Sequence, residues 1–326
     1  ILLFIIFILY YYILYYYKNM NNTVYSLLLL LGIIFIMVIL NNNLSYITEK
    51  YKNKQYNSHS KYNIPYNIFL YWDNLENNDV IQYFINNIKR KFKNTPWKVF
   101  FITRKTVHEY VDQQFYNKFI KLNSVRFSDF LRVKLLYDHG GVWLDASTII
   151  VQPIFLDNFR NKIMKNKCDV LLFEYQSHTI DKRFPYLENW FIMAPKHSIF
   201  IKDLYNYFEK SYDMGFYKFK TDILMKSNVD LSNTIKYGKK TYHMQHAIIH
   251  YMLLKHRNKY NICIEDATQS MFKAQNKVSW NNLELINYIN NNNNWKDYYA
   301  IKLIGNNRKG INNNNKNNFI MKLNTI

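Results

Sequence analysis

Residues 128–147 read SDFLRVKLLYDHGGVWLDAS and predict a helix joined to a strand through two adjacent glycines. The apolar positions before the glycines have helical spacing. Gly140 and Gly141 stop this helix, because one glycine can adopt the left-handed conformation and the other permits close backbone approach. A strand is predicted over residues 142–151, and its first apolar run ends on Asp145. In open α/β sheets, ligands bind at the edge where such strands end.

Asp129 and Arg132 lie three residues apart, so they share one face of the predicted helix. Such a pair is by itself usually a surface salt bridge, and an aspartate at a strand end usually serves a turn. The combination is more specific than either part, because the pair, the double glycine and Asp145 fall within one short stretch. The whole chain has only seven glycines. We therefore expect a functional site here.

Outside this stretch, apolar runs alternate with segments of helical spacing. Strands are predicted at residues 68–72, 97–103, 142–151, 168–174 and 189–194, and helices at 78–93, 105–119, 128–139, 199–211 and 242–256. The alternation predicts a three-layer α/β/α domain with a mostly parallel sheet. The chain contains no GxxxxGK[ST], GxGxxG or GxSxG motif, so the P-loop, dinucleotide-fold and hydrolase-elbow classes lack their fingerprints.

The N-terminal region is strongly apolar. Residues 24–40 form an uncharged run, VYSLLLLLGIIFIMVIL, near the lower length limit for a helix that spans a bilayer. We expect a transmembrane or signal-anchor helix, with a cleaved signal peptide as the main alternative. Residues 1–17 are also apolar, so a two-helix hairpin that turns at residues 18–23 is a second alternative. Met20 is the first methionine, and we expect it to be the natural start.

The predicted organisation has four parts. A hydrophobic N-terminus covers residues 1–40, a polar stem covers 41–62, a globular domain covers 63–304, and an Asn-rich tail that we expect to be mobile covers 305–326. The stem is rich in lysine, which favours the cytoplasmic side of a membrane by the positive-inside rule.

The chain carries 43 Lys and Arg against 23 Asp and Glu, a formal net charge of +20. Such a balance is typical of proteins that bind nucleic acids or anionic membranes. The basic residues are scattered, and the abundant Asn, Lys, Ile and Tyr share A/T-rich codons, so we expect no nucleic-acid partner. Cys168 and Cys263 are too few for a disulfide scaffold or a cysteine-based zinc cluster. We expect two core thiols, with a single bridge as the alternative.

The motif in residues 128–147 resembles the core motif of the capsular-polysaccharide-synthesis-type glycosyltransferases. That family is related to the DXD-containing sugar transferases, which include fungal α-mannosyltransferases. The resemblance extends to IPYNIFLYW at residues 64–72 and to ENWFIMAPKHSIF at residues 188–200, and it covers roughly residues 64–303. It implies a GT-A fold, in which a nucleotide-binding α/β half joins an acceptor half.

The resemblance also implies roles for individual residues. Trp72 would lie against the nucleotide base, and Asp129 and Arg132 would contact the ribose and sugar of the donor. Asp145 matches the first aspartate of the DXD motif and would hold a divalent metal, Mn²⁺ or Mg²⁺, on the donor diphosphate. Ser147 takes the place of the second aspartate. The expected donor-binding set is Trp72, Asp129, Arg132, Gly140, Gly141, Asp145 and Ser147.

Two weaker candidates lie further along the chain. Lys302, in the segment YAIKLI, resembles the lysine of a His-Lys-Leu element in the family, and Ile301 replaces the histidine. His243, His246 and His250 follow the pattern HxxHxxxH, which places them on one helical face and raises the alternative of a zinc site. No HExxH arrangement accompanies them, so we favour structural histidines, with His246 as a candidate contact to the acceptor or the leaving group.

These observations predict a membrane-anchored glycosyltransferase that moves a sugar from a nucleotide-diphospho-sugar to a glycan or glycoconjugate acceptor, with metal assistance through Asp145. No catalytic residue is assigned. Ser147 and Ile301 support the alternative of a catalytically degenerate GT-A-fold protein that only binds nucleotide sugar or glycan. The charge of +20 supports the alternative of a basic membrane-surface adaptor. If the source is eukaryotic, we expect a single-pass protein of the secretory pathway or a Golgi-like membrane.

Overall fold

The computed structural model describes residue 15 and residues 61–76, 79–229, 231–232 and 241–326. By its internal contacts the chain divides into two units, residues 1–60 and 61–326, and nearly all described residues belong to the second. The apolar segment 24–40, predicted to span a membrane, and nearly all of the predicted stem lie outside the described residues. Within the part of the chain that the structure describes, no helix is long and apolar enough to cross a membrane.

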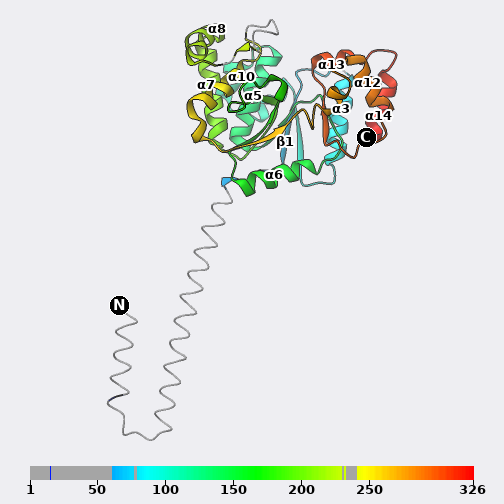
Figure 1. Cartoon of the computed structure of the whole chain (residues 1–326), viewed down its shortest axis with the longest axis horizontal. Coiled ribbons are helices and arrows are strands. Elements are labelled where there is room, and N and C mark those ends of the chain that lie inside the picture. The colour runs from blue at the N-terminus through cyan, green and yellow to red at the C-terminus, as the bar shows by residue number, and fades with distance from the viewer. Residues whose placement is uncertain (1–14, 16–60, 77–78, 230, 233–240) are drawn as a thin grey trace. The chain divides into compact units, whose positions relative to one another are not determined.

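A six-stranded sheet forms the centre of the second unit, with the strand order β2-β1-β3-β6-β5-β7 (Figure 1). The strands are β1 (Asn67–Tyr71), β2 (Lys98–Ile102), β3 (Gly141–Leu144), β5 (Val170–Glu174), β6 (Leu187–Ala194) and β7 (Ile262–Asp266). All run in the same direction except β6, which pairs antiparallel with β3 and β5. The predicted α/β class with a mostly parallel sheet is therefore confirmed.

The strand predicted over residues 142–151 is interrupted, so the prediction of one continuous strand is wrong. β3 ends at Leu144, and a new strand, β4 (Thr148–Ile150), pairs antiparallel with β8 (Ala300–Lys302) in a separate two-stranded sheet. The intervening turn is closed by the Thr148 hydroxyl, which donates a hydrogen bond to the Asp145 carbonyl at 2.9 Å. Because of this turn, the residues after β3 lie beside β8 instead of continuing the central sheet.

Helices pack on both sides of the central sheet, as a three-layer domain requires. One side carries α5 (Ser124–His139), α7 (Ile199–Asp213) and α10 (Met244–His256), and the other carries α3 (Asp79–Phe92) and α6 (Phe155–Asn166). Side chains alternate along β1, since Phe69 and Tyr71 join the first core whereas Ile68 and Leu70 join the second. Figure 1 shows α5, α7 and α10 grouped together, with α3 on the opposite side of the sheet.

Shorter elements complete the domain. The other helices among the described residues are α4 (Gln113–Phe119), α8 (Phe216–Phe219), α11 (Lys273–Lys277), α12 (Asn282–Asn291), α13 (Gly305–Lys309) and α14 (Lys316–Thr325). Single 3₁₀ turns lie at Val107–Glu109, Gln176–His178, Met225–Ser227 and Arg257–Lys259, and a π-helical turn lies at Lys220–Leu224.

Helix α5 begins at Ser124, earlier than the predicted start at residue 128. The earlier start follows from Asn123, whose side chain caps the helix by accepting a hydrogen bond from the Arg126 amide at 3.0 Å. The helix ends where the double glycine predicts, because Gly140 has a φ of 65° that side chains rarely adopt.

The two glycines permit a close approach between backbone segments. A Cβ on Gly140 would lie 2.5 Å from the Lys196 amide nitrogen, and a Cβ on Gly141 would lie 2.5 Å from the Asn67 carbonyl oxygen. Both glycines lie at the amino end of β3, whereas Asp145 follows its carboxyl end. The expectation that these glycines contact the donor is therefore corrected, since they bring β3 against the chain's own backbone.

We expect Gly141→Ala to lower the free energy of unfolding by at least ~2 kcal/mol, because the added Cβ meets a backbone oxygen at a positive φ. Gly215→Ala is the matched control, because its φ is also positive, at 83°, but no atom lies within 4 Å of the added Cβ. This control should cost less, because only the strain of a positive φ remains. Urea unfolding followed by circular dichroism measures both variants, and equal losses would contradict the packing role of Gly141.

The C-terminal residues 305–326, predicted as a separate mobile tail, pack onto the domain. Phe319 and Leu323 of α14 are buried, and the Phe319 ring contacts the Phe84 ring of α3 edge-on, with centroids 5.9 Å apart. The Arg90 guanidinium donates a hydrogen bond to the Leu323 carbonyl at 2.7 Å. The prediction was wrong because these two apolar residues, spaced i,i+4, give the helix a buried face within an asparagine-rich sequence.

Cys168 and Cys263 form a disulfide bond, so the expectation of two core thiols is corrected. The bond joins the segment just before β5 to β7, and these strands are parallel neighbours in the sheet. The two cysteines are 95 residues apart in sequence, and the strand order of the sheet brings them together.

Candidate active site

Asp145 lies directly after β3, at the edge of the sheet where the parallel strands end. Its Oδ2 atom lies 3.1 Å from Lys302 Nζ, and its Oδ1 atom accepts a hydrogen bond from Trp143 Nε1 at 3.0 Å. Arg132 Nη2 lies 3.8 Å from the same Oδ1, and 30% of the Asp145 side chain is exposed. Burial raises the pKa of Asp145, but the charges of Lys302 and Arg132 outweigh it and hold the pKa below its usual value. Asp145 is therefore an ionised carboxylate, partly open to a ligand.

Asp129 and Arg132 are buried together, unlike an ordinary surface pair. Arg132 Nη2 lies 3.4 Å from Asp129 Oδ1, and Arg126 Nη1 lies 3.3 Å from Asp129 Oδ2. Asp129 is only 4% exposed and Arg132 only 5%. Burial raises the pKa of Asp129, and the charges of Arg132 and Arg126 oppose that rise. Arg132 thus bridges Asp129 on the helix and Asp145 after the strand, and the structure brings together the three residues that the sequence singled out.

Groups from β3, β6 and α10 surround the Arg132 guanidinium. It lies over the Trp143 ring at 5.2 Å and donates a hydrogen bond to the Asn189 carbonyl of β6 at 2.9 Å. Gln245 of α10 donates to the Asp129 carbonyl at 3.0 Å and accepts from Asn189 Nδ2 at 2.7 Å. Neither Asn189 nor Gln245 was predicted as a site residue, because both are uncharged and lie outside residues 128–147.

Ser147, in the place of the second DXD aspartate, positions two cations. Its hydroxyl donates a hydrogen bond to the Leu303 carbonyl at 2.9 Å and accepts from Lys302 Nζ at 2.8 Å and Arg308 Nη1 at 3.1 Å. Lys302 belongs to β8 and is only 3% exposed. Burial lowers the pKa of Lys302 below its ordinary value, while the Asp145 carboxylate acts in the opposite direction. The lysine identified through the family resemblance therefore lies in the site.

Arg308 of α13 is a site residue that sequence analysis did not identify. Its guanidinium lies 5.4 Å from the centre of the Trp72 ring. Trp72 is half-buried and follows β1 directly, so its ring lies beside the charged residues near Asp145. The segment that contains Arg308 had been predicted as a tail, and no local signal connected it with the motif.

The site carries more positive than negative charge. Asp129 and Asp145 are its two carboxylates. The cations around them are Arg126, Arg132, Lys302 and Arg308. Such an excess favours an anionic ligand.

His246 lies on α10, on the side of the site formed by β6. Its Nε2 atom lies 3.2 Å from Glu188 Oε2, and the Tyr186 ring stacks on the imidazole with centroids 5.1 Å apart. The Tyr186 hydroxyl lies 3.0 Å from His243 Nδ1. Glu188 precedes Asn189 of the Arg132 network, so the His246–Glu188 pair adjoins the charged site. Among the described residues, no three His, Cys, Asp or Glu side chains are arranged to hold a metal ion.

The donor atoms at Asp145 do not suit a divalent cation. Mg²⁺ takes oxygen ligands at about 2.0–2.1 Å and prefers carboxylates. Asp145 Oδ2 and Ser147 Oγ already lie 3.1 Å and 2.8 Å from the Lys302 ammonium, and Ser147 Oγ also accepts from Arg308. An ion bound to these oxygens would meet two fixed positive charges. The expectation of a divalent metal at Asp145 therefore disagrees with this donor set.

Comparison with known families agrees with the motif. Residues 35–289 match the capsular polysaccharide synthesis protein family, which is most of the chain. The chain belongs to this family. Membership confirms the resemblance drawn from residues 128–147, and with it the assignment as a glycosyltransferase.

The solved structures similar to this capsular polysaccharide synthesis protein include the PaToxG glycosyltransferase. The two chains are 15% identical, with a TM-score of 0.31, over 62% of this chain and 88% of that one. No curated protein matches the chain.

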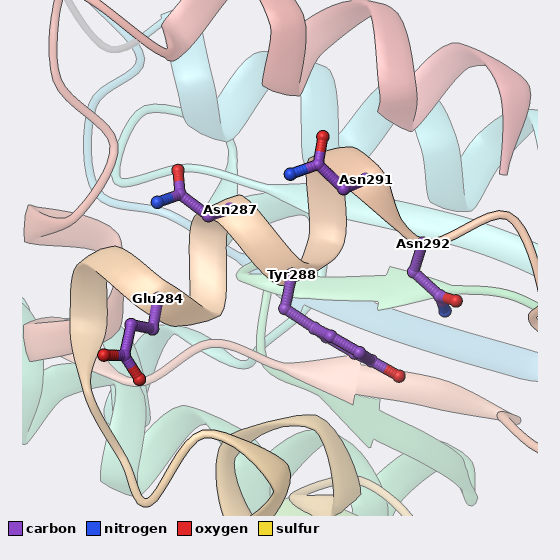
Figure 2. A pocket seen from close by; sticks show the side chains of 5 residues that line it. All are labelled: Glu284, Asn287, Tyr288, Asn291 and Asn292. Atoms are coloured by element: carbon purple, nitrogen blue, oxygen red, sulfur yellow. The ribbon is translucent and has the colours of Figure 1, made fainter.

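A separate hollow of about 450 Å³ lies along α12 of this capsular polysaccharide synthesis protein. Figure 2 shows the lining side chains Glu284, Asn287, Tyr288 and Asn291 projecting from this helix, and that of Asn292 from the residue that follows it. The Tyr288 hydroxyl is hydrogen-bonded to the Tyr298 hydroxyl at 2.7 Å. No lining residue belongs to the charged network, so the candidate active site is assigned from the geometry at Asp145 and not from this hollow.

We expect Asp129→Ala to lower the free energy of unfolding by about 3–5 kcal/mol, because it leaves the Arg126 and Arg132 charges buried without their partner. Glu76→Ala is the matched control, since the Glu76–Lys105 pair is 68% and 83% exposed and should leave stability unchanged. Urea unfolding of both variants measures the difference. An Asp129→Ala variant as stable as the wild type would show that the buried pairs are not required.

Proposed function

We propose that this protein transfers a sugar from a nucleotide-diphospho-sugar to a glycan or glycoconjugate acceptor, on a GT-A-like fold. The observation that carries the proposal is the buried bridge from Asp129 through Arg132 to Asp145. This bridge ends at the sheet edge where ligands bind in open α/β folds. Membership of the capsular polysaccharide synthesis family supports the sugar chemistry.

We assign the donor-binding part of the site to the half of the central sheet that β2, β1 and β3 form. Trp72 follows β1 and offers an aromatic ring for the nucleotide base. Asp129 and Arg132 are buried, with their charged atoms paired, so we assign them the positioning of Asp145. The partly exposed Asp145 carboxylate is then the group that contacts the ribose or the sugar through their hydroxyls.

The acceptor is assigned to the half formed by β6 and α10. His246 and Glu188 face each other there, and Glu188 adjoins Asn189 of the Arg132 network. A paired imidazole and carboxylate offer hydrogen bonds to sugar hydroxyls. We assign this pair to the orientation of the acceptor.

Sugar transfer places new negative charge on the leaving group. The bond between C1 of the sugar and the diphosphate oxygen breaks, and the diphosphate keeps the electron pair. An excess of positive charge fixed near Asp145 stabilises that charge more in the transition state than in the ground state. The donor atoms at Asp145 do not suit a divalent ion, so the protein's own cations are assigned this stabilisation.

We expect Asp145→Asn to lower kcat/KM for transfer roughly 100-fold or more, because the neutral amide no longer holds Lys302 and Arg132. The assay measures nucleoside diphosphate release from UDP-, GDP-, ADP- and dTDP-sugars with a panel of glycan acceptors. Asp213→Asn is the matched control, because Asp213 of α7 is 54% exposed and pairs with Lys118 of α4. Its rate should equal the wild-type rate.

Thermal unfolding of Asp145→Asn separates a loss of function from a loss of fold. A folded variant with full activity would refute the role of Asp145. Tight donor binding by the wild type, without turnover on any acceptor, would favour the alternative of a degenerate fold that only binds.

We also propose that residues 61–326 work in an oxidising compartment, anchored to its membrane through residues 24–40. The Cys168–Cys263 disulfide supports this placement, because such bonds persist in oxidising compartments and are rare in the cytosol. The disulfide argues against a cytoplasmic location, which the lysine-rich stem favours.

We expect both cysteines of the native protein to resist alkylation until a reductant is added. Peptide mass spectrometry after alkylation without reduction measures this, and unfolding in denaturant before alkylation controls for burial of the thiols. Labelling of Cys168 and Cys263 without reductant would place the domain in a reducing compartment.

A further inference from the structure

We propose that Lys302 and Arg308 neutralise the diphosphate of the donor in place of a divalent metal ion. The inference rests on the proposed sugar transfer and specifies how the leaving group is stabilised. Both residues lie beyond residues 35–289, the part of the chain that the family model matches.

Lys302 is a fixed and buried positive charge. Its backbone is held in β8, where it pairs with Thr148 of β4. Its Nζ atom lies 3.1 Å from Asp145 Oδ2 and donates hydrogen bonds to Ser147 Oγ at 2.8 Å and to the Leu303 carbonyl at 3.3 Å. These acceptors set the position of the ammonium group before any ligand binds.

The carboxylates at the site do not neutralise its cations. Asp145 carries one charge and is shared between Lys302 and Arg132. Asp129 is enclosed by Arg126 and Arg132 and lies on the far side of the Arg132 bridge from Lys302. A buried cation that lacks a full counter-charge is costly, so an anion bound beside Lys302 would relieve that cost.

Arg308 also lacks a full counter-charge. Among the described residues, no carboxylate forms an ion pair with its guanidinium, although it is half-buried. Its hydrogen bonds to Ser147 Oγ and to the Leu303 carbonyl, both at 3.1 Å, use Nη1 alone. The guanidinium lies between Ser147 and the Trp72 ring, which is the place for a diphosphate that joins a stacked base to a sugar near Asp145. Guanidinium groups bind phosphate oxygens through paired N–H donors.

The residue at position 147 determines whether these charges are available. A carboxylate there would lie close to both Lys302 and Arg308, and its one negative charge would offset part of their combined positive charge. The Ser147 hydroxyl accepts hydrogen bonds from both but carries no charge. The Asp-Ala-Ser sequence therefore replaces a metal-binding carboxylate with a group that holds two cations ready for an anion.

Sugar transfer from the donor to the acceptor needs no additional reactant. The bond between sugar C1 and the diphosphate oxygen breaks, the electron pair stays on that oxygen, and the acceptor hydroxyl oxygen bonds to C1. The released diphosphate takes up the proton of the acceptor hydroxyl. Lys302 and Arg308 stabilise the negative charge that accumulates on the diphosphate while the C1 bond breaks.

The test is calorimetric binding of inorganic pyrophosphate, UDP and GDP to the full chain in EDTA. We expect at least one probe to bind in EDTA, with a dissociation constant that added Mn²⁺ changes less than about threefold. Arg308→Met should weaken this binding roughly tenfold to a hundredfold, the loss typical of a hydrogen bond between charged groups. Lys309→Met is the matched control, because Lys309 is the next residue of α13 and is exposed.

Lys302 is buried, so its variants are read together with thermal unfolding. Lys302→Arg keeps the charge and should retain most of the binding, whereas a folded Lys302→Met should lose it. Binding that disappears in EDTA and returns with Mn²⁺ would overturn the proposal. Equal binding by Arg308→Met and the wild type, or no binding of any probe, would overturn it as well.

Failure of the proposed function gives a different result. In that case no nucleotide sugar supports transfer, with or without Mn²⁺. If transfer occurs but only with Mn²⁺, the glycosyltransferase function stands and the assignment of Lys302 and Arg308 is wrong.

Discussion

The site depends on the buried guanidinium of Arg132. It lies 3.4 Å from Asp129 on its own helix, 3.8 Å from Asp145 after β3, and over the ring of Trp143. A buried charge is tolerated only where its partners are fixed around it, so α5, β3 and β6 must meet in one arrangement. The same arrangement places the Asp145 carboxylate at the ligand-binding edge of the sheet. The burial of Arg132 therefore couples the packing of the domain to the position of the partly exposed Asp145 carboxylate.

Two local features make that arrangement attainable. Gly141 lets the start of β3 lie against the backbone of Asn67 in β1, where a side chain would clash. The turn after Asp145 then carries the chain out of the central sheet and beside β8, where Ser147 meets Lys302. The consequence is an unusual balance of charge, in which a neutral hydroxyl holds two cations where a DXD motif would supply a second carboxylate. This balance favours an anionic ligand.

Local sequence predicted the centre of the site because that centre is a local structure. A helix, a double glycine and a short strand follow one another in the chain, and they place Arg132 within 4 Å of both Asp129 and Asp145. The surrounding residues are remote in sequence and carry no signal of their own. Gln245 reaches the site from α10, and Arg308 reaches it from a segment whose asparagine-rich composition predicted a tail. Lys302 was found only through the family resemblance, because a single lysine in a strongly basic chain is not informative.

By itself, the sequence determined the α/β class, the mostly parallel sheet and the presence of a charged site after the double glycine. Those properties follow from the periodicity of apolar residues and from the backbone freedom of glycine. Both signals can be recognised within a short stretch of sequence. Only the tertiary structure decided that Cys168 bonds to Cys263, that β6 runs against its neighbours and that residues 305–326 complete the domain. It also decided which charges surround Asp145. Those outcomes depend on strand order and on packing between distant segments. The local sequence around a residue does not indicate which distant residue it will contact.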